Sequence, residues 1–584
     1  MRKTKIVCTL GPSTDNEEIL RQLMYNGMDV ARVNFSHGTH EQQLVRINQF
    51  KKVREETGLP IALLLDTKGP EIRIKTFRDQ KVTLKNDELF TLVKDDVEGD
   101  ETRVCVTYPN LARDLHPGDR VLIDDGLVEL HVVKMEGEDV VCRVINGGTI
   151  SDRKSINIPN VSIQIPYISE QDEADLIFGI ENDFDFIAAS FVRNQFDVLE
   201  VRRILERNGG KDIQIIAKLE NQDGVVNAEQ IIKVSDGIMV ARGDMGVEIA
   251  LEDLPSIQKK LIKDCYYAGK KVITATQMLD SMIRNPRPTR AETTDVANAI
   301  YDGTSAIMLS GETAVGKYPV ESVKTMASIA RRAEQDINYK KRFSELSVEI
   351  ENNITNAISH ATCMTAHDLE AAAIIAVTNS GHTARMVSRY RPQCKVIAPT
   401  ISERVRRQLN LSWGVIPLLS EVKETTDDLF EHVVDLAVKG GYVHNGDIVV
   451  ITGGIPLGVT GTTNILKVHL VGHVLAEGTG INSLNDSGRV CVAESAEAAL
   501  RTFKEGDILV VPKTTNEMLP IIKKAKGIIC EEEGMAVHAA IVGMALDIPV
   551  ITGVHEATKL LKHGTIVTME SSRGLIYAGV TKLS

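Results

Sequence analysis

Two stretches, IQIIAKLE at residues 213–220 and GIMVARGD at residues 237–244, contain the pattern that decides the fold. Each is a short apolar run that ends in charged residues, as a buried strand of a parallel sheet often does. Longer amphipathic segments separate runs of this kind, and such alternation is typical of βα units around one sheet. The first 340 residues therefore predict an α/β fold with a parallel sheet.

Outward from these two stretches, the same part of the chain contains eight candidate strands. They are residues 5–10, 30–33, 61–65, 186–190, 213–217, 237–240, 272–275 and 306–309. Eight parallel strands, each followed by a helix, close a (β/α)8 TIM barrel. We therefore expect a TIM-barrel domain.

The helical period disappears between Lys68 and about Ser162. Short β-branched segments bounded by Gly, Asp and Asn take its place, which indicates a separate β domain. We expect an inserted β-barrel lid domain at residues 69–162, after the third barrel strand. The barrel domain then comprises residues 1–68 and 163–345, about 250 residues, the usual size of such a barrel.

A second αβ pattern follows, with candidate strands at residues 372–377, 395–398, 415–417, 447–452 and 466–471. It predicts an α/β domain at residues 346–475. Residues 476–487 are rich in Gly, Asn and Ser, which predicts a linker. Residues 480–584 are expected to form an extra C-terminal α/β domain.

Composition and charge exclude several classes of protein. The net charge of −13 argues against a nucleic-acid partner, because phosphate backbones recruit basic surfaces. The eight cysteines are scattered without a CxxC pair, which favours a reduced, cytoplasmic protein. The sequence begins with a strand-like segment rather than a signal peptide, and no run of about 18 apolar residues predicts a membrane span.

In a barrel of this kind, functional side chains gather where the strands end. Lys218 and Glu220 are two residues apart and so point to the same side of their strand, while Asp244 ends the next strand. Neighbouring strands lie about 4.8 Å apart, so these groups should be close. Two carboxylates beside a lysine suit Mg²⁺, which takes oxygen ligands and keeps waters for substrate phosphates. The alternative is a purely structural ion pair.

A second cluster of oxygen donors is expected at the ends of the two strands at 30–33 and 61–65. Asn34, Ser36, Asp66 and Thr67 offer neutral oxygens and one carboxylate. This set carries too little charge for tight divalent binding and fits a monovalent cation better. Hydrogen-bonded strand caps are the alternative.

Three basic residues are candidates for binding phosphate. Arg32 and Arg73 can clamp phosphate oxygens, although each alone is equally consistent with an exposed surface arginine. Lys154 lies at the far edge of the inserted domain, where closure would bring it over the site. By itself it is more simply read as a surface lysine.

These residues lie in longer motifs that resemble those of pyruvate kinases. The motifs are VARVNFSHG (30–38), LDTKGPEIR (65–73), AKLEN (217–221), VARGDMGVE (240–248) and ATQMLDSM (275–282). Residues 290–319 also follow the family almost throughout. The order and spacing of the motifs, and the position of the inserted domain, agree with the family as well.

The resemblance implies a phosphotransferase that moves a phosphoryl group from phosphoenolpyruvate to ADP, giving pyruvate and ATP in the last step of glycolysis. It implies Mg²⁺ (or Mn²⁺) and K⁺ as cofactors, a phosphorylated allosteric effector and a homotetramer. The implied roles are catalysis for Lys218, Arg32 and Thr276; substrate binding for Arg32, Lys218, Gly243, Asp244 and Thr276; nucleotide binding for Asn34, His37, Arg73 and Lys154; Mg²⁺ binding for Glu220 and Asp244; and K⁺ binding for Asn34, Ser36, Asp66 and Thr67.

The α/β domain resembles the family's regulatory domain. Its segment TNSGHT follows a predicted strand and opens a helix, which makes a natural phosphate nest. Residues 453–464 are expected to form a facing loop. An ordinary helix cap is the alternative. The implied effector-binding residues are Thr378, Asn379, Ser380, Gly381, His382 and Thr383.

The last domain is similar to the phosphohistidine domain of phosphoenolpyruvate-utilising enzymes, which some bacterial pyruvate kinases carry as an appendage. His538 stands at the position of the phosphorylated histidine. Ala536 and Val537 replace the usual Thr-Ser pair and Met544 replaces the usual Arg. These changes favour a vestigial histidine.

The lid motif also departs from the family. Ser155 and Asn160 stand where the family usually has Gly, on what we expect to be a hinge where Gly supplies freedom. Lid closure over Lys154 is therefore the least secure part of the resemblance.

Two other functions remain open at this point. A Mg²⁺-dependent lyase or aldolase acting on a pyruvate enolate would share Glu220 and Asp244 but would not need Arg73, a lid or the K⁺ residues. A non-catalytic metabolite sensor is the other alternative, and the retention of Lys218 and Thr276 argues against it.

Overall fold

The computed structural model describes residues 2–346, 353–455, 463–472 and 474–580. They form two compact units. The first comprises residues 1–360, 376–421 and 454–464, and the second comprises residues 361–375, 422–453 and 465–584.

The first unit contains a closed barrel of eight strands in the order β1-β17-β16-β15-β14-β13-β3-β2. Neighbouring strands pair in parallel. All eight predicted strands are confirmed to within two residues at either end. Their bounds are β1 Lys5–Thr9, β2 Val30–Asn34, β3 Ala62–Asp66, β13 Phe186–Ala189, β14 Gln214–Leu219, β15 Gly237–Ala241, β16 Lys271–Ala275 and β17 Ala306–Leu309.

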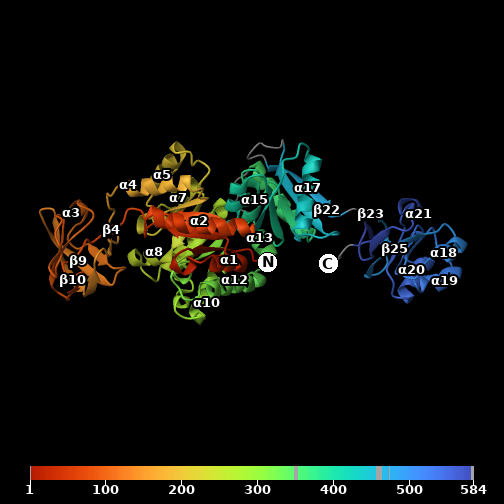
Figure 1. Ribbon diagram of the computed structural model, residues 1–584, viewed down its shortest axis with the longest axis horizontal. Coiled ribbons are helices and arrows are strands. Elements are labelled where there is room, and N and C mark those ends of the chain that lie inside the picture. Colours follow the sequence, from red (N-terminus) through yellow and green to blue (C-terminus); the bar gives the residue numbers. More distant parts are fainter. Residues whose placement is uncertain (1, 347–352, 456–462, 473, 581–584) are drawn as a thin grey trace. The chain divides into compact units, whose positions relative to one another are not determined.

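Helices surround this barrel (Figure 1). Several of them begin where a polar side chain caps the first turn: Thr39 and Ser169, for example, each accept the backbone N–H of the residue three positions on. Several end at a glycine in the left-handed conformation, such as Gly58 and Gly303. The helices are α1 Glu17–Asn26, α2 His40–Thr57, α4 Glu170–Glu181, α5 Gln195–Arg207, α6 Gln222–Val226, α7 Ala228–Val234, α8 Arg242–Glu248, α9 Leu254–Ala268, α10 Arg290–Asp302, α11 Gly311–Ala314, α12 Pro319–Asp336 and α13 Tyr339–Leu346.

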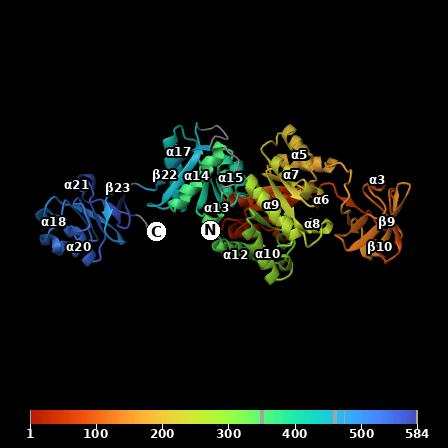
Figure 2. The ribbon, with the colours of Figure 1, turned by 180° about the vertical axis from the view of Figure 1, so that it is seen from behind.

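The inserted domain is a β domain, as expected, and lies beside the part of the barrel that carries α8 (Figures 1 and 2). Its main sheet has the order β4-β12-β8-β9-β10-β6-β7, and a bridge between Ile74 and Val106 joins its two edges. Apolar side chains fill its interior. The elements are β4 Ile72–Arg73, β5 Lys81–Leu84, β6 Leu89–Val93, β7 Arg103–Cys105, α3 Leu111–Asp114, β8 Arg120–Ile123, β9 Val128–Glu136, β10 Asp139–Asn146, β11 Gly148–Ser151 and β12 Ser155–Asn157.

The predicted strands of the α/β domain are also present. They are β18 Ala373–Ala376, β19 Lys395–Thr400, β20 Val415–Leu419, β21 Ile448–Gly454 and β22 Thr463–Leu470, with helices α14 Ile354–Asp368, α15 His382–Arg389, α16 Glu403–Leu409 and α17 Thr426–Lys439. β19 and β20 pair in parallel.

Residues 376–421 of the first unit close the amino-terminal end of the barrel. Leu411 is fully buried within the cluster that fills the barrel interior. The Arg407 guanidinium pairs with Asp185, just before β13, and Lys5 of β1 donates to the carbonyl of Val415. The opposite, carboxyl end of the strands is therefore the end available for a functional site.

The second unit contains an eight-stranded sheet in the order β23-β30-β29-β25-β26-β27-β28-β24. Its elements are β23 Val474–Glu477, β24 Thr479–Gly480, β25 Asn485–Val492, α18 Ala496–Thr502, β26 Ile508–Val511, α19 Leu519–Ile522, β27 Gly527–Cys530, α20 His538–Ala545, β28 Val550–Thr552, α21 Ala557–Leu560, β29 Ile566–Glu570 and β30 Leu575–Ala578.

The prediction of a linker at residues 476–487 is wrong, because three strands of this sheet pass through that segment. Gly480 packs so closely against the backbone of Ser571 that a Cβ there would overlap it. The glycines serve close packing rather than freedom of the chain.

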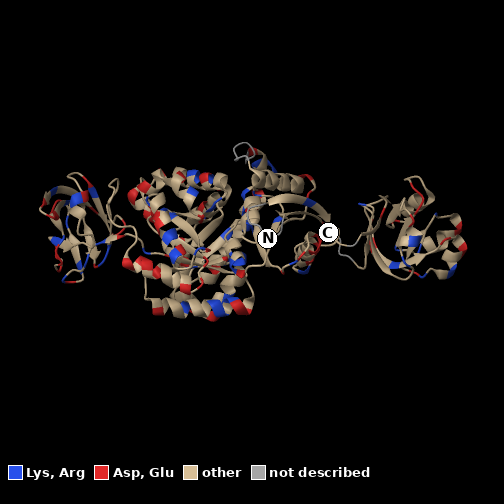
Figure 3. Cartoon of the chain, turned by 90° about the horizontal axis from the view of Figure 1, so that it is seen from above, with Lys and Arg blue, Asp and Glu red and all other residues tan. Residues whose placement is uncertain are grey.

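Charged residues of both signs are interspersed over the barrel helices (Figure 3). In the part of the chain that the structure describes, no helix is both long and apolar enough to cross a membrane.

Candidate active site

Lys218, at the carboxyl end of β14, is the centre of a buried polar network. Its Nζ donates to Asp66 Oδ1 at 3.0 Å and to Ser190 Oγ at 2.8 Å, and it pairs with Glu220 Oε1 at 3.0 Å. Burial lowers the pKa of Lys218, but the Asp66 and Glu220 carboxylates more than offset it and raise the pKa above its ordinary value. Lys218 is therefore a fixed positive charge.

Asp66 connects Lys218 to Arg32. Arg32 Nε donates to Asp66 Oδ2 at 2.5 Å, and Arg32 Nη1 donates to Thr9 Oγ1 at 2.9 Å. Although burial raises the pKa of Asp66, the charges of Arg32 and Lys218 lower it below its ordinary value. The structure thus places two cationic side chains, both bound to one carboxylate, at the same end of the barrel.

Glu220 and Asp244 have the properties of a divalent-cation site. Glu220 is almost fully buried, and its Oε2 accepts the backbone N–H of Phe191 at 2.6 Å. Burial raises the pKa of Glu220, Lys218 opposes this, and the carboxylate of Asp244 raises it further, with a net rise well above the ordinary value. A buried carboxylate and a partly buried one that repel each other are stabilised by a cation between them.

The donor set fits Mg²⁺ rather than a metal held by protein ligands alone. No group of three or more His, Cys, Asp or Glu side chains suited to a metal occurs among the described residues. Mg²⁺ is typically bound by one or two carboxylates and completes its shell with waters and substrate oxygens.

The predicted K⁺ residues lie at the ends of adjacent strands. Asn34 of β2 is the register partner of Asp66 of β3, and Asn34 Oδ1 accepts the N–H of Ser36 at 3.0 Å. Thr67 Oγ1 accepts the N–H of Ser190 at 3.1 Å. Both Asp66 oxygens already contact cationic side chains, so the neutral oxygens of the other three residues are the better candidates for a weakly held monovalent cation.

Thr276 is held in an unusual turn after β16. Both Thr276 and Gln277 have positive φ angles, 68° and 53°. Such a conformation costs about 1–2 kcal/mol per residue, and Arg242 stabilises it by donating to the carbonyls of both residues. As a result, Thr276 Oγ1 accepts the N–H of Gly243 at 2.7 Å, which brings the ends of β15 and β16 together.

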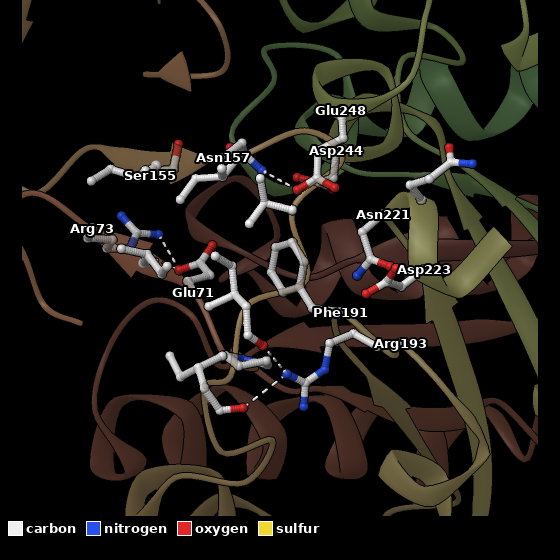
Figure 4. A pocket seen from close by; sticks show the side chains of 18 of the residues that line it. Glu71, Arg73, Ser155, Asn157, Phe191, Arg193, Asn221, Asp223, Asp244 and Glu248 are labelled. Carbon is white, nitrogen blue, oxygen red and sulfur yellow. Dashed lines mark hydrogen bonds and ion pairs between the residues drawn. The ribbon is translucent and has the colours of Figure 1, made fainter. Parts of the chain in front are cut away.

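A cavity of about 480 Å³ lies between the inserted domain and the barrel. Asp244 of the barrel and Arg73 of the inserted domain line it (Figure 4). Lys154 of the inserted domain is also among the lining residues. Arg73 pairs with Glu71 at 2.7 Å and Lys154 with Asp124 at 2.9 Å, so both cations are held within the inserted domain. His37 is exposed after β2 and is not among the residues that line the cavity.

The expectation of a hinge at Ser155 is wrong. Ser155 lies in β12 and pairs with Arg73 of β4, so its backbone is fixed by the sheet. Asn160 does have a positive φ of 63°, the conformation that favours Gly. The inserted domain contacts the barrel through Asn157, whose Nδ2 donates to Glu248 Oε1 at 3.3 Å (Figure 4).

Two residues that contribute to the site, Ser190 and Arg242, were not predicted as site residues. Each directly follows a barrel strand. That position was the only signal in the sequence, and a single serine or arginine after a strand is usually a solvated loop residue.

The predicted effector segment begins after β18 and ends in the first turn of α15. Gly381 is the N-cap of α15 with a φ of 79°, and Thr383 Oγ1 is hydrogen-bonded to Thr463 Oγ1 at 2.8 Å. Asn464 and Ile455 bond to each other at the base of the predicted facing loop. Residues 456–462 of that loop lie outside the described residues.

His538 begins α20 in the C-terminal domain. Its Nδ1 is hydrogen-bonded to Thr514 Oγ1 at 2.7 Å and its Nε2 to Asn516 Oδ1 at 3.0 Å. Both ring nitrogens are therefore engaged by neutral side chains.

Fold and site together define a class: a (β/α)8-barrel protein with a buried cluster of charged side chains at the carboxyl end of its strands, beside an inserted β domain. Comparisons with known proteins are more specific. The family description "Pyruvate kinase, barrel domain" matches residues 1–323, "Pyruvate kinase, alpha/beta domain" matches residues 356–469, and "PEP-utilising enzyme, mobile domain" matches residues 503–574.

Whole-chain relatives agree with these matches. The pyruvate kinase of Sporosarcina psychrophila is 50% identical over 584 residues and that of Geobacillus stearothermophilus 49% over 580, with 99% of both chains covered in each case. The crystal structure of a pyruvate kinase from Cryptosporidium parvum superposes with a TM-score of 0.77 at 37% identity, covering 80% of this chain and 96% of that one. The chain belongs to the pyruvate kinase family.

Proposed function

We propose that this chain transfers the phosphoryl group of phosphoenolpyruvate to ADP, giving pyruvate and ATP. The observation that carries the proposal is the position of Lys218, a buried and permanently charged amine beside the Glu220 and Asp244 carboxylates. Phosphoryl transfer needs fixed positive charge and exact placement more than covalent chemistry.

Each group of the site has a defined task in this reaction. Mg²⁺, when bound by Glu220 and Asp244, neutralises phosphoryl and carboxylate oxygens of the substrate. Lys218 stabilises the negative charge of the transferring phosphoryl group, and Arg32, held by Asp66, binds its oxygens. Lys218 and Arg32 enter the reaction already oriented, because both are fixed by buried hydrogen bonds.

Thr276 and the backbone of Gly243 form the part of the site that holds the carboxylate end of the substrate. The strained turn presents the Thr276 hydroxyl at the strand end. When the phosphoryl group leaves, the enolate is protonated through water near Thr276. Arg73 and Lys154, on the wall of the cavity, bind the phosphates of ADP.

Three further properties are part of the proposal. K⁺ binds through Asn34, Ser36 and Thr67 with Asp66; a phosphorylated effector binds at residues 378–383; and the chain assembles as a homotetramer in the cytoplasm. Support comes from the strand-end positions of the oxygen donors and from the helix N-terminus at Gly381.

One assay separates this function from the alternatives. Lactate dehydrogenase reports the pyruvate formed from phosphoenolpyruvate, and the part of that signal that depends on ADP reports phosphoryl transfer. A lyase or aldolase forms no ATP in this assay, and a metabolite sensor forms neither product. Absence of ADP-dependent pyruvate formation with Mg²⁺ and K⁺ present would refute the proposal.

A further inference from the structure

The loop that follows β2 is closed by one buried amide side chain, that of Gln43. This loop, residues 34–39, joins β2 to α2 and contains two of the proposed K⁺ ligands, Asn34 and Ser36. Gln43 is the fourth residue of α2 and is 4% exposed. Its Nε2 donates to the Asn34 carbonyl at 3.1 Å and to the His37 carbonyl at 2.7 Å. One amide group therefore holds two points of the loop that are three residues apart.

The orientation of this amide is fixed from its other side. Gln43 Oε1 accepts a hydrogen bond from Arg46 Nη1 at 3.1 Å. Arg46 in turn donates to both carboxylate oxygens of Asp15, at 2.7 and 2.8 Å. A flipped amide would place its oxygen against two carbonyl oxygens and its N–H groups against a guanidinium, so only this orientation satisfies every group. Gln43 is thus committed to donating toward the loop.

The remaining contacts of the loop complement those of Gln43. The Phe35 N–H donates to the Asp66 carbonyl at 2.9 Å, and the Ser36 N–H donates to Asn34 Oδ1 at 3.0 Å. Asn34 is therefore held both through its backbone carbonyl and through its side chain. Release of the two carbonyls from Gln43 would free the backbone between Asn34 and His37, and with it the positions of the Asn34 and Ser36 oxygens.

A neutral amide suits the base of a loop that binds a cation. Arg32 and Lys218, both paired with Asp66, already place two positive charges at this end of the barrel. A lysine or arginine in place of Gln43 could donate to the same two carbonyls, but its charge would repel a cation bound by the loop. The amide donates two hydrogen bonds and adds no charge.

We propose that Gln43 is a positioning residue of the monovalent-cation site, which it preorganises by holding the carbonyls of Asn34 and His37. The inference rests on the proposed function, because K⁺ is itself part of that proposal. Gln43 acts through Asn34 and Ser36 rather than as a ligand. A loop that is ordered when the chain folds binds a cation more tightly than one that must be ordered on binding. Loss of the two donors should therefore weaken cation binding.

Direct binding of a monovalent cation to the full chain tests the proposal. Tl⁺ resembles K⁺ in size and charge, and its binding is followed by thallium NMR with Mg²⁺ and phosphoenolpyruvate present and ADP absent. Gln43→Met keeps the length of the side chain but removes both donors. We expect its dissociation constant for Tl⁺ to rise about tenfold, which corresponds to about 1.4 kcal/mol. The K⁺ concentration that gives half-maximal activity should rise by a similar factor.

Gln42→Met is the matched control. Gln42 is the neighbouring residue of α2, and its Oε1 accepts the N–H of Thr39 at 3.2 Å as part of the helix cap. Its side chain is exposed and, among the described residues, donates to no carbonyl of the loop. This variant loses a contact that stabilises the start of α2 but should bind Tl⁺ as tightly as the original protein does.

Arg46→Met tests the same connection without altering Gln43. It removes the contact that orients the amide and leaves both of the amide's own donors in place. We expect a smaller rise in the dissociation constant for Tl⁺, about threefold, because only one hydrogen bond is lost. Arg46 is partly exposed, so this variant decides the question if Gln43→Met fails to fold.

The outcomes separate this inference from the proposed function. Unchanged Tl⁺ affinity in folded Gln43→Met or, if that variant does not fold, in Arg46→Met would overturn the inference, and a lowered melting temperature with unchanged affinity would show that Gln43 serves stability alone. An equal loss of affinity in Gln42→Met would also overturn it, because the loss would then come from the start of α2 in general. Absence of Tl⁺ binding to the original protein would instead refute the proposed K⁺ site itself.

Discussion

Replacing Lys218 with methionine should abolish most of the phosphoryl transfer while leaving the binding of a divalent cation near normal. Methionine keeps much of the apolar length of the side chain but removes the charge that contacts Asp66, Ser190 and Glu220 at 2.8–3.0 Å. The Lys218 amine stabilises the transition state and does not bind the metal, so Glu220 and Asp244 remain in place to hold the cation.

The expected magnitude follows from the burial of this amine. Removal of one preorganised donor from a water-excluded site typically lowers kcat by about 10²–10³-fold, or about 2.7–4 kcal/mol. Truncating one partner of a buried ion pair also costs about 3–5 kcal/mol of stability. We expect the loss of stability to lie at the lower end, about 3 kcal/mol, because Asp66 keeps its hydrogen bond to Arg32.

Turnover is measured as pyruvate formation at saturating phosphoenolpyruvate and ADP, and metal binding by titration with Mn²⁺ followed by electron paramagnetic resonance. Lys5→Met is the control, since it removes a buried lysine from the amino-terminal end of the barrel, where Lys5 donates to the Val415 carbonyl. Near-normal turnover in a folded Lys218→Met protein would remove Lys218 from the mechanism. Loss of Mn²⁺ binding together with turnover would show that Lys218 organises the metal site instead.

Four further outcomes are expected. Activity should require K⁺, because Glu71 stands where relatives with a lysine supply their own positive charge, and full activity in a buffer without K⁺ and Na⁺ would contradict this. A phosphorylated effector should raise the affinity for phosphoenolpyruvate by about 1–3 kcal/mol of coupling. Ser380→Glu should abolish that activation by placing a carboxylate in the nest. If every sugar phosphate and AMP activates the Ser380→Glu variant as it activates the original protein, the effector site lies elsewhere. A chain ending at Val471 should keep its turnover but lose stability, because Arg573 donates to the Gly446 carbonyl. A large loss of turnover in the folded truncated protein, or label from phosphoenolpyruvate that disappears in His538→Ala, would show a chemical role for the last domain. Finally, burial raises the pKa of Asp185 to about 6, above its value of 3.8 in the unfolded chain, so the folded state binds this proton more tightly. The free energy of unfolding should therefore fall by about 3 kcal/mol as pH rises from about 4 to 6. Urea unfolding of Asp185→Asn should lack that part of the fall, and the same pH profile in the variant and the original protein would contradict the prediction.

The sequence by itself predicted the barrel, which the structure confirms, and a candidate site at the ends of its strands. Each strand of a (β/α)8 barrel is a local apolar run, and its carboxyl end is marked by the polar residues that follow it. Lys218, Glu220 and Asp244 are candidates on this ground, because the first two lie at the end of β14 and the third follows β15.

The same reasoning failed where composition had more than one physical cause. Glycines at residues 476–487 indicated a linker, although Gly480 is there to let β24 approach the backbone of Ser571. Ser155 was expected at a hinge, yet pairing with β4 fixes it within a sheet. A glycine-rich pattern does not distinguish freedom of the chain from close approach of two backbones.

Only the tertiary structure decided which groups meet. Asp66 and Lys218 are 152 residues apart, and Ser190 comes from the strand between theirs. Arg407 and Asp185, 222 residues apart, meet in the same way at the other end of the barrel. Such encounters depend on strand order, register and the closure of the barrel, which are set by packing over the whole chain and leave no periodic signal in any one segment of it.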